Sequence, residues 1–122
     1  MERIFSVEEA NSLIPELTEL LERLQRVHRS TAAVEGRALR RLASSNGSAD
    51  AASAASAAGE EYLTALSAIE SMGVVVRDPE SGLVDFASSR DGNPIYLCWR
   101  LGEDRVGFWH PRDTGFAGRE PL

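Results

Sequence analysis

The sequence contains no lysine, a single cysteine and no long apolar run. A lone cysteine, Cys98, excludes a disulfide within the chain and is typical of a reducing compartment. No apolar stretch approaches the ~18 residues that a membrane helix needs, and the charged N-terminus MERIFSVEEAN lacks the apolar segment of a secretory signal. We therefore expect a cytoplasmic protein with no membrane partner.

The charge balance is acidic, with a net charge of -6 and a pI near 4.9. Nucleic-acid binding draws its affinity from clustered Lys and Arg, so this balance argues against a nucleic-acid partner. The length of 122 residues fits one domain, and 43% hydrophobic with 26% charged residues is an ordinary globular composition. We expect a single domain over 1–122, helical in 1–73 and built of strands and a tail in 74–122.

The first part of the chain predicts helices. Ser6 and Glu9 have the spacing of a capping box, which predicts a short capped helix over 7–13, and Pro15 predicts a kink or a restart there. Apolar residues at alternating spacings of three and four then predict a long helix to about residue 42. An Ala-rich second helix follows a short loop, so we expect a long antiparallel helical hairpin.

After Gly73 the pattern changes to short β-branched and aromatic runs. These runs predict four antiparallel strands, with a loop over 88–94 around Asp91-Gly92 and an irregular C-terminal tail pinned by Phe116. The expected strands cover 74–76, 83–86, 95–101 and 106–109. The predicted fold class is α+β, with the helical hairpin packed on a small four-stranded antiparallel sheet.

The last hairpin decides which side chains can meet. A turn with Glu103 at its tip pairs Leu97 with His110, which directs His110 and Cys98 to opposite faces of the sheet. This register disfavours a shared Cys/His site within one chain. It also separates Glu103 from His110 by roughly 15 to 20 Å, so Glu103 reaches such a site only from a neighbouring chain.

Carboxylates from several segments are expected near His110. Asp85, Asp91 and Asp113 lie in strands or loops that lead toward the same end of the sheet, and one His with two or three carboxylates can hold a divalent metal. No recognised ligand spacing is present. The alternative is a histidine at the rim of the core, hydrogen-bonded to a carbonyl or a carboxylate.

Arginines and aromatics in the same region are candidates for ligand binding. Arg100, Trp109 and Arg119 could contact an anionic small molecule, although surface ion pairs and core packing explain the same residues. Cys98 is expected to be a buried, inert thiol because a reactive cysteine needs an electropositive and partly exposed setting. Covalent catalysis by Cys98 is a distant third alternative.

Two stretches of the chain carry a resemblance to a known family. They are FSVEEANSLIPEL and GLVDFASSRDGNPIYLCWRLGEDRVGFWHPRDTGFAGREPL, and through them the chain resembles the bacterial family catalogued as domain of unknown function 2203. The resemblance implies a small cytoplasmic bacterial protein and brings no activity. It implies that the family pattern includes Asp85, Cys98, Trp99, Glu103, Trp109, His110 and Arg119.

Two classes of function follow. The first is a non-catalytic oligomeric binding module, a dimer paired through its apolar and small-residue helix faces. The alternative is a metal-binding protein or metal-dependent hydrolase that uses His110 and Asp85. Its further ligands would be Asp91, Asp113 or Glu103 from a neighbouring chain, and Arg119 would bind an anionic substrate. A divalent metal is the one cofactor that the residues suggest.

Overall fold

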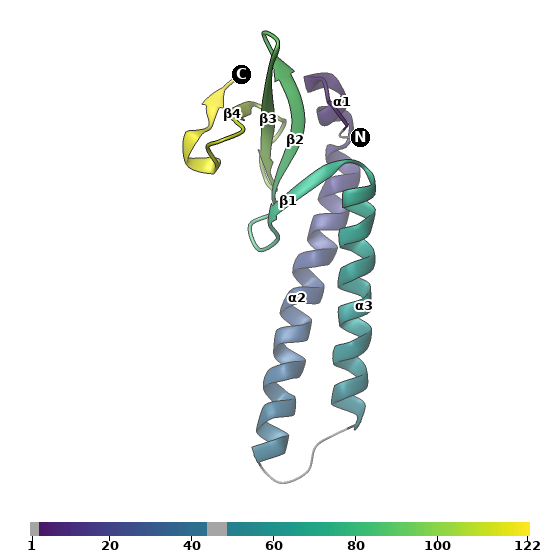
Figure 1. Cartoon of the computed structure of the whole chain (residues 1–122). Coiled ribbons are helices and arrows are strands. Elements are labelled where there is room, and N and C mark those ends of the chain that lie inside the picture. Colours follow the sequence, from purple (N-terminus) through teal and green to yellow (C-terminus); the bar gives the residue numbers. More distant parts are fainter. Residues whose placement is uncertain (1–2, 44–48) are drawn as a thin grey trace.

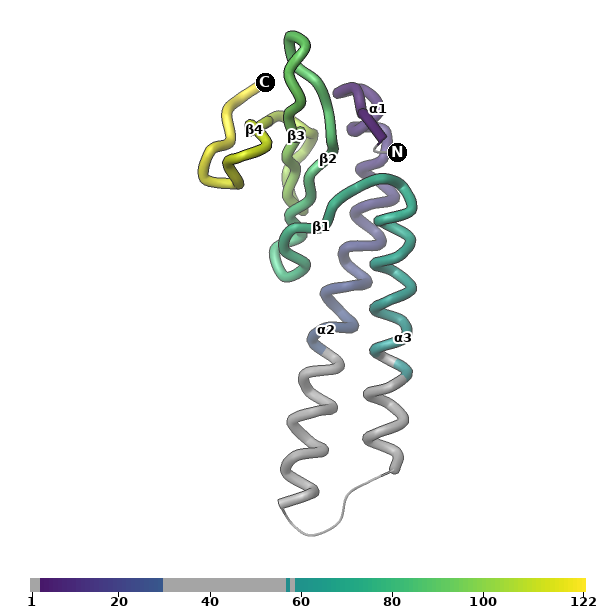
Figure 2. The backbone as a smooth tube through the Cα atoms, in the orientation of Figure 1, coloured from purple at the N-terminus to yellow at the C-terminus, as the bar shows by residue number. Residues whose placement is uncertain are grey.

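A computed structural model describes residues 3–43 and 49–122, and the side chains of residues 3–29, 57 and 59–122 (Figure 2). Within this part the chain is a mixed α+β protein with three α-helices and a five-stranded antiparallel sheet of order β1-β2-β3-β4-β5 (Figure 1). The helices are α1 (Val7–Ser12), α2 (Ile14–Ala43) and α3 (Ala49–Ser71), with a short 3-10 helix η1 (Phe116–Gly118). The strands are β1 (Val74–Asp78), β2 (Leu83–Arg90), β3 (Asn93–Arg100), β4 (Phe108–Pro111) and β5 (Glu120–Pro121).

The predicted capping box opens α1. The Ser6 hydroxyl accepts a hydrogen bond from the Glu9 amide at 3.1 Å, and the Glu9 carboxylate accepts one from the Ser6 amide at 3.2 Å. The chain restarts as α2 at Ile14, which puts Pro15 in the first turn, where a missing N–H is tolerated. The short capped helix and the restart are both confirmed.

Helices α2 and α3 lie side by side, and one face of the sheet packs on them (Figures 1 and 2). The core between them includes Leu17, Leu21 and Leu24 from α2, Ile69 from α3 and Phe86, Leu97 and Trp99 from the sheet. None of the described helices combines the length and the apolarity that crossing a membrane requires. One face of the sheet is therefore buried against the helices, and the opposite face is not covered by them.

The connection between β2 and β3 is a two-residue turn. Asp91 and Gly92 have positive φ angles of 52° and 80°, the geometry that lets a tight hairpin follow the strand twist. The strands consequently extend to Arg90 and restart at Asn93. The prediction of a longer loop over 88–94 is wrong, because the Asp-Gly pair suffices to reverse the chain.

The register between β3 and β4 differs by one residue from the predicted one. Leu97 pairs with Trp109 and Tyr96 pairs with His110, whereas the predicted hairpin joined Leu97 to His110. Residues 101–107 form an irregular loop in place of a tight turn, and Val106 donates its amide to the Asn11 side chain at 2.8 Å. Since strand side chains alternate, this one-residue difference reverses the facing of every β4 side chain.

The C-terminal segment adds a fifth strand. Residues of β5 pair with β4, with Phe108 opposite Pro121 and Trp109 opposite Glu120. The predicted four-stranded sheet with an irregular tail is therefore wrong in strand number. The sequence gives no sign of this strand, because two residues are too few to produce an alternating apolar and polar pattern.

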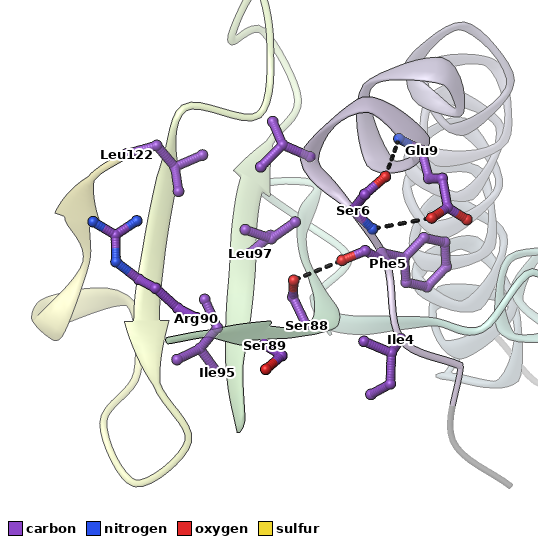
Figure 3. A pocket seen from close by; sticks show the side chains of 11 residues that line it. Ile4, Phe5, Ser6, Glu9, Ser88, Ser89, Arg90, Ile95, Leu97 and Leu122 are labelled. Carbon is purple, nitrogen blue, oxygen red and sulfur yellow. Dashed lines mark hydrogen bonds between the residues drawn. The ribbon is translucent and has the colours of Figure 1, made fainter. Parts of the chain in front are cut away.

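The N-terminal segment is held against β2. The Phe5 amide donates to the Ala87 carbonyl at 2.7 Å. The Ser88 hydroxyl donates to the Phe5 carbonyl at 2.6 Å, as Figure 3 shows. Beside these contacts lies an open pocket of about 360 Å³ whose walls include the exposed side chains of Ile4 and Leu122. Residues near both ends of the described chain thus contribute to the wall of this pocket.

Candidate metal centre

The site lies on the sheet face opposite the helices. Asp85 pairs directly with Cys98, and His110 pairs with Tyr96, two residues along β3 from Cys98. Residues two apart in a strand point to the same face, so Asp85, Cys98 and His110 share one face. The prediction that Cys98 and His110 face opposite ways is wrong, and the changed β4 register is the reason.

All three side chains are buried. Asp85 and His110 are each 2% exposed and Cys98 is 1% exposed. One ligand atom from each, a carboxylate oxygen, the thiol sulfur and an imidazole nitrogen, lie within 4.8 Å of one another. A buried carboxylate needs a charged or hydrogen-bonded partner, so this cluster depends on its immediate contacts.

Asp85 has a partner on each carboxylate oxygen. Its Oδ1 lies 3.0 Å from His110 Nε2, and its Oδ2 accepts a hydrogen bond from Arg77 Nε at 2.8 Å. The hydrogen bond to Asp85 raises the pKa of Arg77, so the guanidinium stays charged. Arg77 comes from β1, Asp85 from β2, Cys98 from β3 and His110 from β4. Four neighbouring strands therefore build one polar cluster.

The two nitrogens of His110 have different tasks. Nδ1 lies 2.8 Å from the Pro111 carbonyl oxygen, which can only accept, so Nδ1 carries a proton. In the neutral imidazole Nε2 then holds a lone pair that faces the Asp85 carboxylate. Two lone-pair atoms at 3.0 Å need a positive charge between them, either a proton or a metal ion. An Nδ1–H bonded to a backbone carbonyl is also the usual support of a metal-binding histidine.

Cys98 is held as a neutral thiol. Burial raises its pKa to about 12, and the negative charge of Asp85 acts in the same direction. A thiol in this state is a poor nucleophile, as expected from the sequence, but a metal ion deprotonates a coordinating thiol outright. Cys98 can therefore be an unreactive thiol in the metal-free protein and still be a ligand when a metal ion binds.

The cluster opens into a pocket of about 290 Å³. The walls are formed by Arg77, Leu83, Asp85, Cys98, His110, Arg112, Thr114, Gly115 and Phe116. The Arg77 and Arg112 guanidinium carbons lie 4.9 and 4.5 Å from the centre of the Tyr96 ring. The polar cluster is thus the floor of a pocket with two arginines in its wall.

The ligand set suits a tetrahedral metal ion. Zinc binds sulfur at about 2.3 Å and nitrogen or oxygen at about 2.0 Å, which sets ligand atoms about 3.3–3.8 Å apart. The upper limit of 4.8 Å in this cluster exceeds that spacing by on the order of 1 Å, within the reach of side-chain rotation. Thiolate, imidazole and carboxylate together favour zinc or a related transition metal over magnesium or calcium.

Glu103 and Arg119 lie outside this cluster and engage each other. Arg119 Nη2 donates to Glu103 Oε1 at 2.8 Å, and the same carboxylate oxygen accepts the Arg100 amide at 2.7 Å. The Trp99 indole also donates to the Glu103 carbonyl at 3.0 Å. These contacts tie the C-terminal segment to the 101–107 loop.

The remaining candidates are spread over the surface. Asp91 and Asp113 are exposed, on the β2–β3 turn and after β4, and Arg100 is exposed with its guanidinium 5.5 Å from the Phe116 ring centre. Trp109 is half-buried, packs against the core and carries Arg90 over its ring at 4.9 Å. None of these candidates lines the pocket of the cluster.

The structure adds two residues that the metal hypothesis did not include. Cys98 was set apart by the predicted register, and Arg77 was not considered. Arg77 does leave a signal in the sequence, since it is the charged residue that ends the apolar run Val74-Val75-Val76. A charge at that position in a strand can pair with an opposite charge on the neighbouring strand.

Comparison with known proteins gives a family. No curated protein and no solved structure matches the chain. A family model described as "Uncharacterized conserved protein (DUF2203)" matches residues 3–122, essentially the whole chain. The chain therefore belongs to this family of domain of unknown function 2203.

Proposed function

We propose that this chain binds a divalent transition metal ion, with zinc as the best fit, through Asp85, Cys98 and His110. The observation that carries the proposal is the grouping of three buried ligand atoms of different chemistry within 4.8 Å. His110 supports it further, because Nδ1 donates to the Pro111 carbonyl and leaves Nε2 as the ligand atom. Arg77 holds the Asp85 carboxylate in place from the outside.

A metal ion with three protein ligands keeps a fourth position for water or substrate. All three ligands line the 290 Å³ pocket, so that fourth position would face the pocket. A metal-bound water with a pKa near ~7 is a nucleophile at neutral pH. The reaction class that this arrangement favours is hydrolysis, with the metal as Lewis acid and the pocket as the substrate site.

Cobalt substitution tests the ligand set. Co²⁺ bound to a thiolate gives a near-ultraviolet charge-transfer band, which we expect in the wild type at a stoichiometry of one. Cys98→Ser removes the only thiol of the chain and should abolish this band, while His110→Ala should weaken cobalt binding by about tenfold to a hundredfold or more. A wild-type spectrum of hydrated cobalt, with no thiolate band, would refute the site.

Metal affinity should depend on pH with a defined sign. The Cys98 thiol has a pKa of about 12 in the metal-free protein and must lose its proton to bind the ion. Rising pH therefore weakens the competition from protons, and the Kd for zinc should fall by about tenfold per pH unit from this group alone. Competitive chelator titrations over several pH values measure it, and Cys98→Ser should show a shallower slope. A Kd that is flat with pH would contradict thiolate ligation.

We propose as a second candidate function an oligomeric binding module, in which α2 and α3 form a helical hairpin that pairs with a second copy of this chain. The supporting observation is Leu63 on α3, which at 61% is the most exposed of the large apolar side chains among the described residues. Burying such a residue against a second copy would remove it from water. Pairing of this kind is compatible with a metal site, because the site faces away from the helices.

Light scattering tests the pairing. One chain has a mass of 13.3 kDa, so a dimer should scatter with about twice that mass. Leu63→Glu should shift the equilibrium to monomer, whereas Thr64→Glu adds the same charge at an exposed neighbouring position and should leave it intact. A monomeric wild type at micromolar concentration would refute the proposed pairing of two copies.

A further inference from the structure

We propose that the pocket beside the N-terminal segment binds a small amphipathic carboxylate, with Arg90 holding the charged group and apolar side chains holding the rest. This N-terminal pocket has a volume of about 360 Å³ and shares no wall residue with the pocket of the metal centre. The inference is therefore independent of the proposed metal site. The volume lies near the lower end of ligand pockets, which favours a ligand of about ten heavy atoms.

The apolar part of the pocket is exposed to an unusual degree for this protein. Four large apolar side chains are exposed among the described residues, and two of them, Ile4 at 52% and Leu122 at 44%, line this one pocket. Ile95 and Leu97, which belong to the buried core, also form part of its wall. An apolar chain bound between Ile4 and Leu122 would remove both side chains from water, which is favourable.

Arg90, at the end of β2, supplies a positive charge in the same wall. Its guanidinium carbon lies 4.9 Å from the centre of the Trp109 ring, and stacking on an aromatic face fixes the plane of the guanidinium. Arg77 and Arg119 each form an ion pair with a carboxylate, whereas Arg90 forms none with any described residue. Its planar N–H donors therefore remain available for a carboxylate from a ligand.

Glu9 does not cancel this charge. It is the one carboxylate among the described residues of the wall, and Figure 3 shows it on the side of the pocket away from Arg90. Its Oε1 accepts the Ser6 amide at 3.2 Å, and its Oε2 lies 3.8 Å from Arg3 Nη2. Because Glu9 already has these partners, the charge that the pocket leaves for a ligand is the positive one of Arg90. In Figure 3 Arg90 and Leu122 lie together, so the ligand's carboxylate would lie beside Leu122 and its chain would extend toward Ile4.

Octanoate is the probe in the experiment that tests this pocket. It is titrated into nitrogen-15-labelled wild-type protein while the backbone amide signals are followed by NMR. Saturable shifts are expected at Ile4, Ser89 and Leu122, with a Kd below about 2 mM. Octanamide has the same chain without the charge, and acetate has the charge without the chain. Each should bind more weakly than octanoate by about tenfold or more, since each lacks one of the two contacts.

Two pairs of variants separate the pocket from the rest of the surface. Arg90→Gln should weaken octanoate binding by about tenfold, whereas Arg105→Gln removes the same charge at an exposed position outside the pocket and should leave the affinity unchanged. Ile4→Ser should weaken binding by about fivefold, because apolar contact area is lost. Leu63→Ser is its control, since Leu63 is also exposed but does not line the pocket. All four positions are exposed, so the ligand-free spectra should show the wild-type fold.

Three results would overturn the inference. The first is the absence of saturable shifts up to about 10 mM octanoate. The second is equal affinity for octanoate and octanamide, or equal octanoate affinity in Arg90→Gln and wild type, because the charge would then play no part. The third is a set of shifts centred on Leu63 in place of the pocket, which would mean unspecific binding to exposed apolar surface. None of these results bears on the metal centre.

Discussion

Replacing Asp85 by Ala is expected to lower the free energy of unfolding of the metal-free protein by about 3 kcal/mol, because a buried carboxylate and the contacts of both its oxygens are lost. The carboxylate holds His110 on one oxygen and Arg77 on the other, and both lose their partner when it is removed. His110 is 2% exposed, so water cannot replace the lost contact without opening the site. Urea denaturation measures the change.

Two control variants define what the Asp85 result means. Asp85→Asn keeps the shape and one acceptor for Arg77, so its cost should lie between that of Ala and the wild type. Asp113→Ala removes an exposed carboxylate and should change stability by no more than about 0.5 kcal/mol. A cost below about 1 kcal/mol for Asp85→Ala would mean that the buried cluster does not hold the sheet together.

The second large effect concerns the two tryptophans. Trp99 is 1% exposed in the core, and its indole N–H donates to the Glu103 carbonyl at 3.0 Å. Trp99→Ala should lower the free energy of unfolding by about 3–5 kcal/mol through cavity formation, with the lost hydrogen bond included. In a domain of this size such a loss approaches the whole stability, so the variant is expected to be partly unfolded.

Trp109 provides the matched comparison. It pairs with Leu97 at the edge of the same face and is only half-buried, with Arg90 over its ring. Trp109→Ala should therefore cost less than half as much as Trp99→Ala in the same urea titration. An equal loss of unfolding free energy in the two variants would contradict the conclusion that Trp99 is buried in the core and Trp109 is only half-buried.

Local features of the fold could be predicted from the sequence because their causes are local. The capping box of Ser6 and Glu9 involves residues three apart, and the helix end at Gly73 depends on the positive φ of 86° that glycine adopts freely. The mixed α+β class follows from the change of hydrophobic period after Gly73. These elements required no knowledge of distant contacts.

The strand register could not be predicted because distant contacts decide it. Val106 leaves the expected hairpin to bond Asn11, which is 95 positions away in the sequence, and Glu103 bonds Arg119 from the C-terminal segment. A tight hairpin satisfies the local pattern of residues 97–110 equally well. The fifth strand likewise depends on where the chain returns after η1.

Two of the three clustered side chains were predicted to lie near each other, and the third was predicted to lie apart. Asp85 and His110 were expected to meet, and they lie 3.0 Å apart. Cys98 was excluded only because a one-residue difference in register reverses a strand's faces. The roles of Arg100, Trp109 and Arg119 as ligand-binding residues remain predictions, and their contacts in the structure are with other parts of the protein.

The most direct test of the metal centre is the metal content of untagged protein purified without chelator, measured by elemental mass spectrometry. The wild type is predicted to carry close to one transition metal ion per chain, and His110→Ala to carry almost none. His28→Ala is the control, because His28 is the other histidine and its side chain is 52% exposed on α2. No metal in the wild type, or equal metal in His110→Ala, would contradict the account and make Asp85, Cys98 and His110 a structural hydrogen-bonded cluster.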